Sequence, residues 1–161
     1  MEPWNKRLFE YRRLFNPAFC ALVLLRAING YKEVSGKGMP FSLLFLVLPL
    51  CLFEDSRIIL KKNNRGNFQK IISTYPEILV GFPKRASALA SYTMEGLGYA
   101  HHRGLFSIEE GAMLISGNVL KSSYSGSLEV QDCQKVAYNL GKKFAKVGSK
   151  ITIFTILGVR P

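Results

Sequence analysis

The chain has 161 residues, a length typical of one compact domain, and this excludes a large multidomain enzyme. Hydrophobic residues make up 48% and charged residues 20% of the chain, which is enough apolar material for a core and excludes intrinsic disorder. The 22 lysines and arginines exceed the 11 acidic residues, so the net charge is +11 and the expected partner is nucleic acid, an anionic membrane or an acidic protein.

The N-terminal part begins with a mixed segment and continues into an apolar helix. Residues 1–15 alternate aromatic and aliphatic side chains with lysines and arginines, as in a docking arm or a short first helix. Asn16 and Pro17 then form a helix N-cap and first position, and Asn29-Gly30 is a typical helix end. The helix between them is apolar on nearly all sides, so we expect it to be buried.

The second apolar segment raises the question of a membrane span. From Gly38 to Phe53 the chain has no charged residue for 16 positions, fewer than the roughly 20 needed to cross a bilayer. Pro40 and Pro49 interrupt it. We predict a buried core helix from Pro40 to about Phe53, kinked at Pro49, that follows the loop from Glu33 and forms an interior hairpin with the first helix.

The middle of the chain has the order helix, turn, helix and hairpin. Two short helices are expected around the turn at residues 63–66, and a longer helix at residues 83–103, where apolar residues recur every three to four positions. Two short strand-like runs, residues 105–108 and 113–115, predict a β-hairpin. This order is that of a winged helix over residues 56–120.

The C-terminal part begins with a polar connector at residues 121–127. A helix from Leu128 to Val147 follows, with one apolar face and lysines on the other. The last apolar run, residues 151–157, is rich in β-branched residues and predicts a strand, with a helix as the alternative.

The expected fold class is α+β, mainly α. It combines a buried helical hairpin, a winged-helix-like segment with a small β-hairpin, and a C-terminal amphipathic helix. We expect one compact domain over residues 1–161, made of three parts: residues 1–55, 56–120 and 121–161.

The three cysteines indicate the compartment. Cys20, Cys51 and Cys133 are an odd number of thiols at wide spacing, each among apolar neighbours, which favours buried thiols over a disulfide framework. No small-residue cleavage site follows the apolar run that begins at Phe19, so we expect no secretory signal. The prediction is a cytoplasmic protein.

No group of residues predicts a catalytic, cofactor or metal site. His101 and His102 are adjacent, so on a helix they point about 100° apart and cannot ligate one metal together. The cysteines lack C-x-x-C spacing. The segment Gly30–Gly38 does not have the spacing of a phosphate-binding loop, and Glu109-Glu110 is typical of a solvated hairpin tip. We therefore expect no enzyme and no cofactor.

The positive charges carry a more specific signal. Residues 57–70 hold five lysines or arginines and no acid, and after Asp132 the chain again carries only basic charges. We predict that these blocks contact a phosphate backbone or an acidic protein, with backbone contact favoured over base reading because the long helix offers few cations. Alternatively, the cations only keep an apolar chain in solution. The candidate contact residues are Arg57, Lys61, Lys62, Arg65, Lys70, Lys84, Arg85, Arg103, Lys135, Lys142, Lys143, Lys146 and Lys150.

Several segments together resemble a known family. They are Leu14-Phe15-Asn16-Pro17-Ala18-Phe19-Cys20, Gly38-Met39-Pro40-Phe41 with its leucine-rich continuation, Gly104-Leu105 at the hairpin, and the terminal Leu157-Gly158-Val159-Arg160-Pro161. These segments resemble the middle component of the three-component ABC-ATPase systems of bacteria, to which Lamassu-type anti-phage defence systems belong.

The resemblance implies a non-catalytic adaptor. In such systems the small subunit accompanies an SMC/Rad50-like ABC ATPase and a toxic effector, often a nuclease, so the ATP and cleavage chemistry would belong to those partners. DNA would be reached through the complex, and no membrane partner is implied. Two other functions stay open: a free winged-helix DNA-binding regulator, and a small membrane-associated protein that uses Met39 to Phe53.

Overall fold

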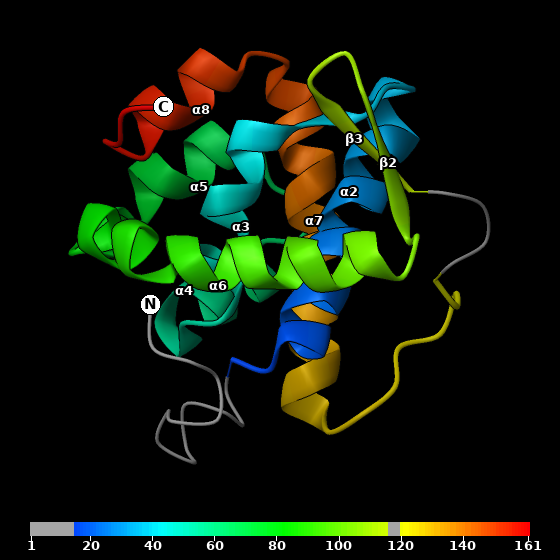
Figure 1. The fold of residues 1–161 in the computed structure, drawn as a ribbon. Helices are drawn as coiled ribbons and strands as arrows, with labels where there is room; N and C mark the ends of the chain where they lie inside the picture. The colour runs from blue at the N-terminus through cyan, green and yellow to red at the C-terminus, as the bar shows by residue number, and fades with distance from the viewer. Residues whose placement is uncertain (1–14, 116–119) are drawn as a thin grey trace.

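The structure is a computed structural model that describes residues 15–115 and 120–161, so the arm or first helix expected over residues 1–15 lies, except for Phe15, outside the described residues. In chain order, the elements in Figure 1 are α2 (Pro17–Ser35), β1 (Met39–Pro40), the 3₁₀ helix η2 (Phe41–Leu43), α3 (Leu44–Cys51), α4 (Glu54–Lys62), α5 (Phe68–Thr74), the 3₁₀ helix η3 (Pro76–Leu79), α6 (Phe82–His102), β2 (Phe106–Glu109), β3 (Ala112–Ile115), α7 (Leu128–Val147) and α8 (Lys150–Ile156). The fold class is α+β and mainly α, as expected, with one small antiparallel sheet.

Two long helices form the centre of the molecule. α2 and α7 pack against each other more extensively than any other described pair, and α6 runs across α2 (Figure 1). α3 packs on both α6 and α2, so α2 and α3 do touch as the expected hairpin requires. The main partner of α2 is nevertheless α7, which follows it by about a hundred residues in the sequence.

α2 begins as the sequence predicts but ends later. The Asn16 side chain accepts a hydrogen bond from the Ala18 backbone N–H at 2.8 Å, which caps the first turn. The predicted end at Gly30 is wrong, because the helix continues to Ser35. Its C-cap is Gly36, whose φ of 69° lies in the left-handed region that favours glycine.

Gly30 is a contact residue between helices and not a helix end. A Cβ at Gly30 would lie 2.0 Å from the carbonyl oxygen of Tyr138 in α7. A Cβ at Gly141 would lie equally close, 2.0 Å, to the carbonyl oxygen of Ala27 in α2. The two helices approach so closely that only glycine fits at these two positions.

The segment expected to form one helix from Pro40 to Phe53 is divided. Met39 and Pro40 form β1, which pairs with β3 so that Met39 lies opposite Met113, and only then do η2 and α3 begin. Pairing with a hairpin more than 60 residues away is a long-range effect that the local pattern does not contain. Pro49 lies inside α3, which is buried almost throughout, so the prediction of a core helix is confirmed.

The middle elements follow the expected order. α4 and α5 flank the turn at residues 63–66, α6 spans the long helix, and β2 and β3 form the hairpin. The hairpin turn places Glu110 at a φ of 47° and Gly111 at 74°. With β1 the sheet has the order β1-β3-β2, and all its pairs are antiparallel.

The end of the chain is helical. α7 has the predicted bounds. The strand favoured at residues 151–157 is wrong and the alternative, a helix, is confirmed, since this segment forms α8. Ser149 caps α8 by accepting a hydrogen bond from the Thr152 N–H at 3.3 Å. Ile153, Phe154 and Leu157 are buried, a helical spacing, so packing outweighs the β-propensity of the branched side chains.

Candidate functional site

Arg57, one of the predicted contact residues, is used inside the molecule. Its side chain is buried and donates hydrogen bonds to the carbonyl oxygens of Cys51 and Leu52, both at 3.1 Å, and to the Glu129 carboxylate at 2.8 Å. These bonds tie the C-terminal end of α3 to the N-terminal end of α7. A guanidinium held by three acceptors has an architectural role and is not an exposed cation.

Lys143 has a similar role at the other end of α7. Its ammonium group is buried and donates to the carbonyl oxygens of Asn63, Asn64 and Gly66 at 3.0, 2.6 and 2.8 Å. Burial, together with the charge of Lys146, lowers the pKa of Lys143 to about 8. Lys143 thereby fixes the turn between α4 and α5 against the C-terminal end of α7.

Arg85 is half-buried and holds the turn before α6. It donates to the carbonyl oxygens of Val80 and Ile78 at 2.7 and 2.9 Å. Its guanidinium carbon lies 4.8 Å from the centre of the Phe53 ring, a cation–π contact. Burial lowers the pKa of Arg85. Like Arg57, this side chain is occupied by contacts within the chain.

Two further candidates are exposed or half-exposed but paired with acids. The Lys61 ammonium lies 2.7 Å from the Asp132 carboxylate, and the Lys142 ammonium lies 3.3 Å from that of Glu33. The Tyr138 hydroxyl also donates to Glu33. Their charges are therefore partly balanced within the chain.

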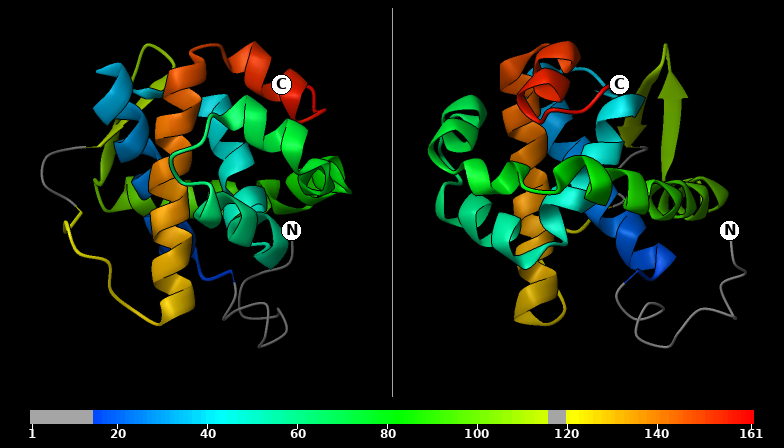
Figure 2. Two further views of the ribbon diagram at one scale, coloured as in Figure 1. Left: turned by 180° about the vertical axis from the view of Figure 1, so that it is seen from behind. Right: turned by 90° about the vertical axis from the view of Figure 1, so that its left-hand side faces the viewer.

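Five other cations of the two basic blocks are carried by segments that pack near the C-terminal end of α7. Because Lys143 binds the turn after α4, the end of α7 lies against that turn, and α5 and α8 pack on α7 as well (Figure 2). The segments 56–76 and 133–161, which carry these elements, contain no acidic residue. We define the basic face by five of their exposed cations: Lys62, Arg65, Lys70, Lys146 and Lys150.

The last three candidates are exposed at other places. Lys84 lies in the first turn of α6 and Arg103 directly after its last residue, so the length of the helix, about 30 Å, separates them. The Lys135 ammonium lies 5.8 Å from the ring centre of Tyr124. The cations of α6 thus stand at its two ends and not along one face, which does not favour base reading by this helix.

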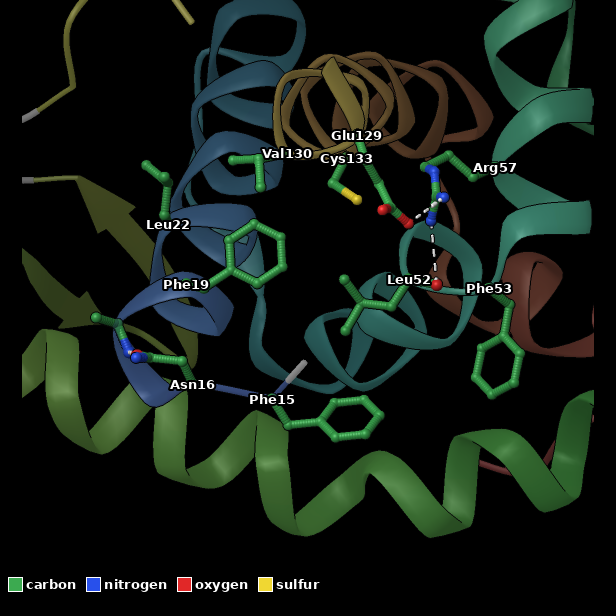
Figure 3. A pocket seen from close by; sticks show the side chains of 11 residues that line it. Phe15, Asn16, Phe19, Leu22, Leu52, Phe53, Arg57, Glu129, Val130 and Cys133 are labelled. Carbon is green, nitrogen blue, oxygen red and sulfur yellow. Dashed lines mark hydrogen bonds and ion pairs between the residues drawn. The ribbon is translucent and has the colours of Figure 1, made fainter. Parts of the chain in front are cut away.

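An apolar groove lies at the opposite end of α7 from the basic face. It has a volume of about 620 Å³, and three parts of the chain form it: the start of α2, the junction of α3 and α4, and the start of α7. Figure 3 shows Phe15, Phe19 and Leu52 around a common space, with the Arg57–Glu129 pair on one wall. Sequence reasoning missed this site because its aromatic residues have the same pattern as core residues.

Carboxylates gather beside this groove, although the whole chain is strongly basic. Glu129, whose side chain is 70% exposed, lines the groove, and Glu54 and Asp55 directly follow the lining residue Phe53. Burial and the charges of Glu129 and Asp132 raise the pKa of the lining Cys133 thiol, against the opposing effect of Arg57. The acids at the starts of α4 and α7 were the available sequence signal for this second surface.

The residues weighed earlier for catalysis do not come together. His101 and His102 are exposed at the end of α6, and Glu110 is exposed at the hairpin tip. The segment Gly30–Gly38 lies partly in α2, so it is not a loop throughout. Within residues 15–115 and 120–161, no three or more His, Cys, Asp or Glu residues are grouped so that they could hold a metal ion.

The apolar segment Met39–Phe53 is largely internal. Most of its residues are buried beneath α6 and beside α2, with Phe41 and Phe53 partly exposed. In the described part of the chain, no helix combines the length and the apolar character needed to cross a membrane.

The model of the family "ABC-three component (ABC-3C) system Middle Component 3" matches residues 4–161, a range that includes the basic face, the groove and both central helices. No curated protein and no solved structure matches the chain. The match confirms the three-component family that the sequence resembles. The chain belongs to the Middle Component 3 family of ABC-three component systems.

Proposed function

We propose that the chain is a non-catalytic adaptor in a bacterial anti-phage defence complex of the Lamassu type. It bridges an SMC-like ABC ATPase and an effector with nuclease-like chemistry, and it works in the cytoplasm. Membership of the Middle Component 3 family supports an assembly of several components. The free thiols of Cys20, Cys51 and Cys133 are all buried, which supports a reducing compartment.

One observation carries the bridging role. The basic face and the apolar groove have different chemistry and lie at opposite ends of α7, where Lys143 and Glu129 are 14 residues, or roughly 21 Å, apart along the helix. A rigid helix between two unlike surfaces is suited to hold two partners at a fixed distance. An adaptor needs two such surfaces, whereas a free-standing regulator needs one.

In this proposal the basic face contacts the phosphate backbone of DNA held by the ATPase. Five exposed cations on the segments 56–76 and 133–161, which contain no acidic residue, produce a positive field that attracts phosphate without reading base sequence. Arg57, Lys143 and Arg85 do not contribute directly, because they are bound to carbonyl oxygens within the chain.

The chain itself performs no catalysis in this proposal. Its buried cations bind backbone carbonyls, and the two charged groups that line the groove, Arg57 and Glu129, bind each other. Hydrolysis of ATP therefore belongs to the ATPase, and cleavage belongs to the effector. Purified protein that hydrolysed ATP or nucleic acid, with loss of that activity in Lys37→Ala or His101→Ala, would contradict this.

A second candidate function is a free winged-helix DNA-binding regulator. The sequence placed the winged helix at residues 56–120, which hold α4, α5, α6, β2 and β3. The sheet order β1-β3-β2 instead supports an arrangement that uses α2, β1, α3, α6, β2 and β3, with α4 and α5 inserted. In that arrangement α6 would be the recognition helix. Its exposed cations Lys84 and Arg103 stand at its ends, so we favour the adaptor.

The experiment compares two triple charge reversals in the three-component complex. The first variant changes Lys62, Arg65 and Lys146 of the basic face to Glu. The matched control changes Lys84, Arg103 and Lys135, which are exposed elsewhere. We measure complex assembly and the affinity for duplex DNA over a range of salt concentrations.

We expect the first variant to assemble, to bind DNA more weakly, and to have a salt slope smaller by about 3, because three phosphate contacts are lost. The control variant keeps most of the affinity. Loss of assembly with unchanged DNA affinity per complex would show that the basic face is a protein interface. If neither property changes, the cations serve solubility only. Sequence-specific DNA binding by the chain alone would favour the regulator.

A further inference from the structure

We infer that the apolar groove docks a segment of another component of the same system, one that carries large apolar side chains flanked by lysine or arginine. This inference rests on the proposed adaptor function and names the chemistry of one partner. The groove is the space of about 620 Å³ between the start of α2, the α3–α4 junction and the start of α7.

The groove is held open by contacts that need no partner. Arg57 binds the carbonyl oxygens of Cys51 and Leu52 on one wall and the Glu129 carboxylate on another. On the α2 side, the Phe15 ring stacks on the Tyr92 ring of α6 with the ring centres 4.6 Å apart. A preformed site loses little conformational entropy on binding, so it favours a ligand that enters without rearrangement.

The lining favours apolar side chains of a protein over a small polar ligand. Phe15, Phe19, Leu22, Leu52 and Val130 contribute apolar walls. Sites for small polar ligands have polar groups that converge on the ligand. In this groove the charged lining groups, Arg57 and Glu129, are hydrogen-bonded to each other. They therefore hold the walls in place and do not converge on a ligand. Apolar anchors that fill such a groove are typical of helix-in-groove recognition.

The apolar surface continues out of the groove at Phe53, which lines the groove and is still 38% exposed. Arg85 lies over the Phe53 ring and binds the carbonyl oxygen of Val80, so the backbone of Val80, an exposed apolar residue, lies near Phe53. An extended segment or a helix can therefore contact more than the groove alone.

The charges beside the groove indicate which charged residues should flank the apolar side chains of the bound segment. Glu129, whose side chain is 70% exposed, lines the groove, and the exposed Glu54 directly follows the lining residue Phe53. The neighbouring cations are engaged within the chain, since Arg57 is buried and bound to Glu129 and Lys61 is paired with Asp132. This acidic border disfavours nucleic acid and an anionic membrane. It favours cationic flanks, in contrast to the basic face of the same chain.

The test uses photo-crosslinking in the co-expressed three-component complex. Benzoylphenylalanine replaces Phe53 in the groove, and in the control it replaces Ile108, an exposed apolar residue of the hairpin. Mass spectrometry identifies the linked peptide. We expect a crosslink from position 53 to a segment of the ATPase or of the third component that contains large apolar residues beside Lys or Arg, and none from position 108.

A charge reversal then tests the acidic border. The variant Glu54→Lys with Asp55→Lys weakens the crosslink yield at position 53 by about tenfold, since it replaces attraction with repulsion. The matched control, Glu109→Lys with Glu110→Lys, reverses another exposed acidic pair at the hairpin tip and leaves the yield unchanged. An equal yield in both variants would overturn the charge argument.

The outcomes separate this inference from the proposed function. If the chain assembles with the other components but position 53 crosslinks to none of them, the groove is not the docking site and the adaptor function stands. A crosslink to residues 1–14 of the same chain, or to a second copy, also overturns the inference. If the wild-type chain does not associate with the other components at all, the proposed function itself fails.

Discussion

The two ends of α7 differ in how they use charge. At the N-terminal end, Glu129 and Asp132 are exposed or half-exposed, while the nearby Arg57 is buried. At the C-terminal end the exposed charge belongs to Lys146, while Lys143 is buried. At each end one buried cation binds backbone carbonyls and holds the neighbouring helices in place. The comparison shows that the architectural cations and the exposed charges are different residues.

The helix dipole explains part of this arrangement. Acids near a helix N-terminus and cations near its C-terminus stabilise the helix by a few tenths of a kcal/mol each. The separation of acidic from basic charges extends beyond α7, however. Lys62 and Arg65 at the end of α4, Lys70 of α5 and Lys150 of α8 extend the positive end, and the dipole of α7 gives no reason for them.

The largest expected effect comes from disrupting the packing of α2 on α7, which supports both ends of α7. Gly141→Ala places a Cβ 2.0 Å from the carbonyl oxygen of Ala27, so α2 and α7 must separate. We expect a loss of at least about 3 kcal/mol in the free energy of unfolding, measured by denaturant titration. The matched control is Gly98→Ala in α6, where nothing lies within 4 Å, and it stabilises the chain by about 0.5 kcal/mol. Equal stability of the two variants would contradict the close approach.

Arg57→Met affects the groove end and leaves the basic face in place. The variant removes the donors to the carbonyl oxygens of Cys51 and Leu52, and we expect a loss of about 2 kcal/mol in unfolding free energy. Glu129→Gln is the control, because the Glu129 side chain is largely exposed and its pairing contributes little.

Two functional measurements on Arg57→Met test whether the two ends of α7 act independently. We expect crosslinking from position 53 to fall while the DNA affinity of assembled complexes is unchanged. If DNA affinity falls equally, the two ends of α7 are not independent surfaces.

Local sequence signals account for the parts of the fold that depend on neighbouring residues. The Asn16 cap, the two strand-like runs of the hairpin and the amphipathic pattern of α7 predict their elements correctly. The errors arise where a distant element decides. β1 exists because Met39 pairs with Met113. Gly30 does not end α2, because glycine is needed there for the close approach of the Tyr138 carbonyl oxygen.

The candidate site shows the same limit. The acid-free segments of the sequence predicted two basic blocks, but not that Lys143 would be buried, since that depends on a turn about 80 residues away. The groove could not be predicted, because Phe19, Leu52 and Val130 come from separate elements. An aromatic residue in an exposed groove and one in a core have the same local pattern.

Lys143→Met tests the basic end and has a pH dependence with a definite sign. Loss of three hydrogen bonds to carbonyl oxygens costs about 1–2 kcal/mol at pH 7. The pKa of Lys143 is lowered to about 8 in the folded state, below the ordinary value of 10.5. Between these two pH values the unfolded chain binds more protons, so the contribution of this group to stability rises with pH.

The measurement is the difference in unfolding free energy between the wild-type chain and Lys143→Met from pH 7 to pH 10.5. We expect the unfolding free energy of the wild type, relative to that of the variant, to increase as the pH rises through 8. Burial raises the pKa values of Cys20 and Tyr31, which destabilises both proteins equally at high pH and cancels in the difference. A constant difference would show that the pKa of Lys143 is not lowered.

The smallest expected effect comes from the ion pair between Lys61 and Asp132, near the N-terminal end of α7. The atoms are 2.7 Å apart, but the Lys61 side chain is 55% exposed, so water screens the attraction. A double-mutant cycle with Lys61→Met and Asp132→Asn should give a coupling of about 0.5 kcal/mol. A coupling of 2 kcal/mol or more would mean that exposed ion pairs hold α4 on α7, so that the separation of acidic and basic charges serves packing within the chain. A small coupling means that folding gains little from these charges, which favours a role for them in binding a partner.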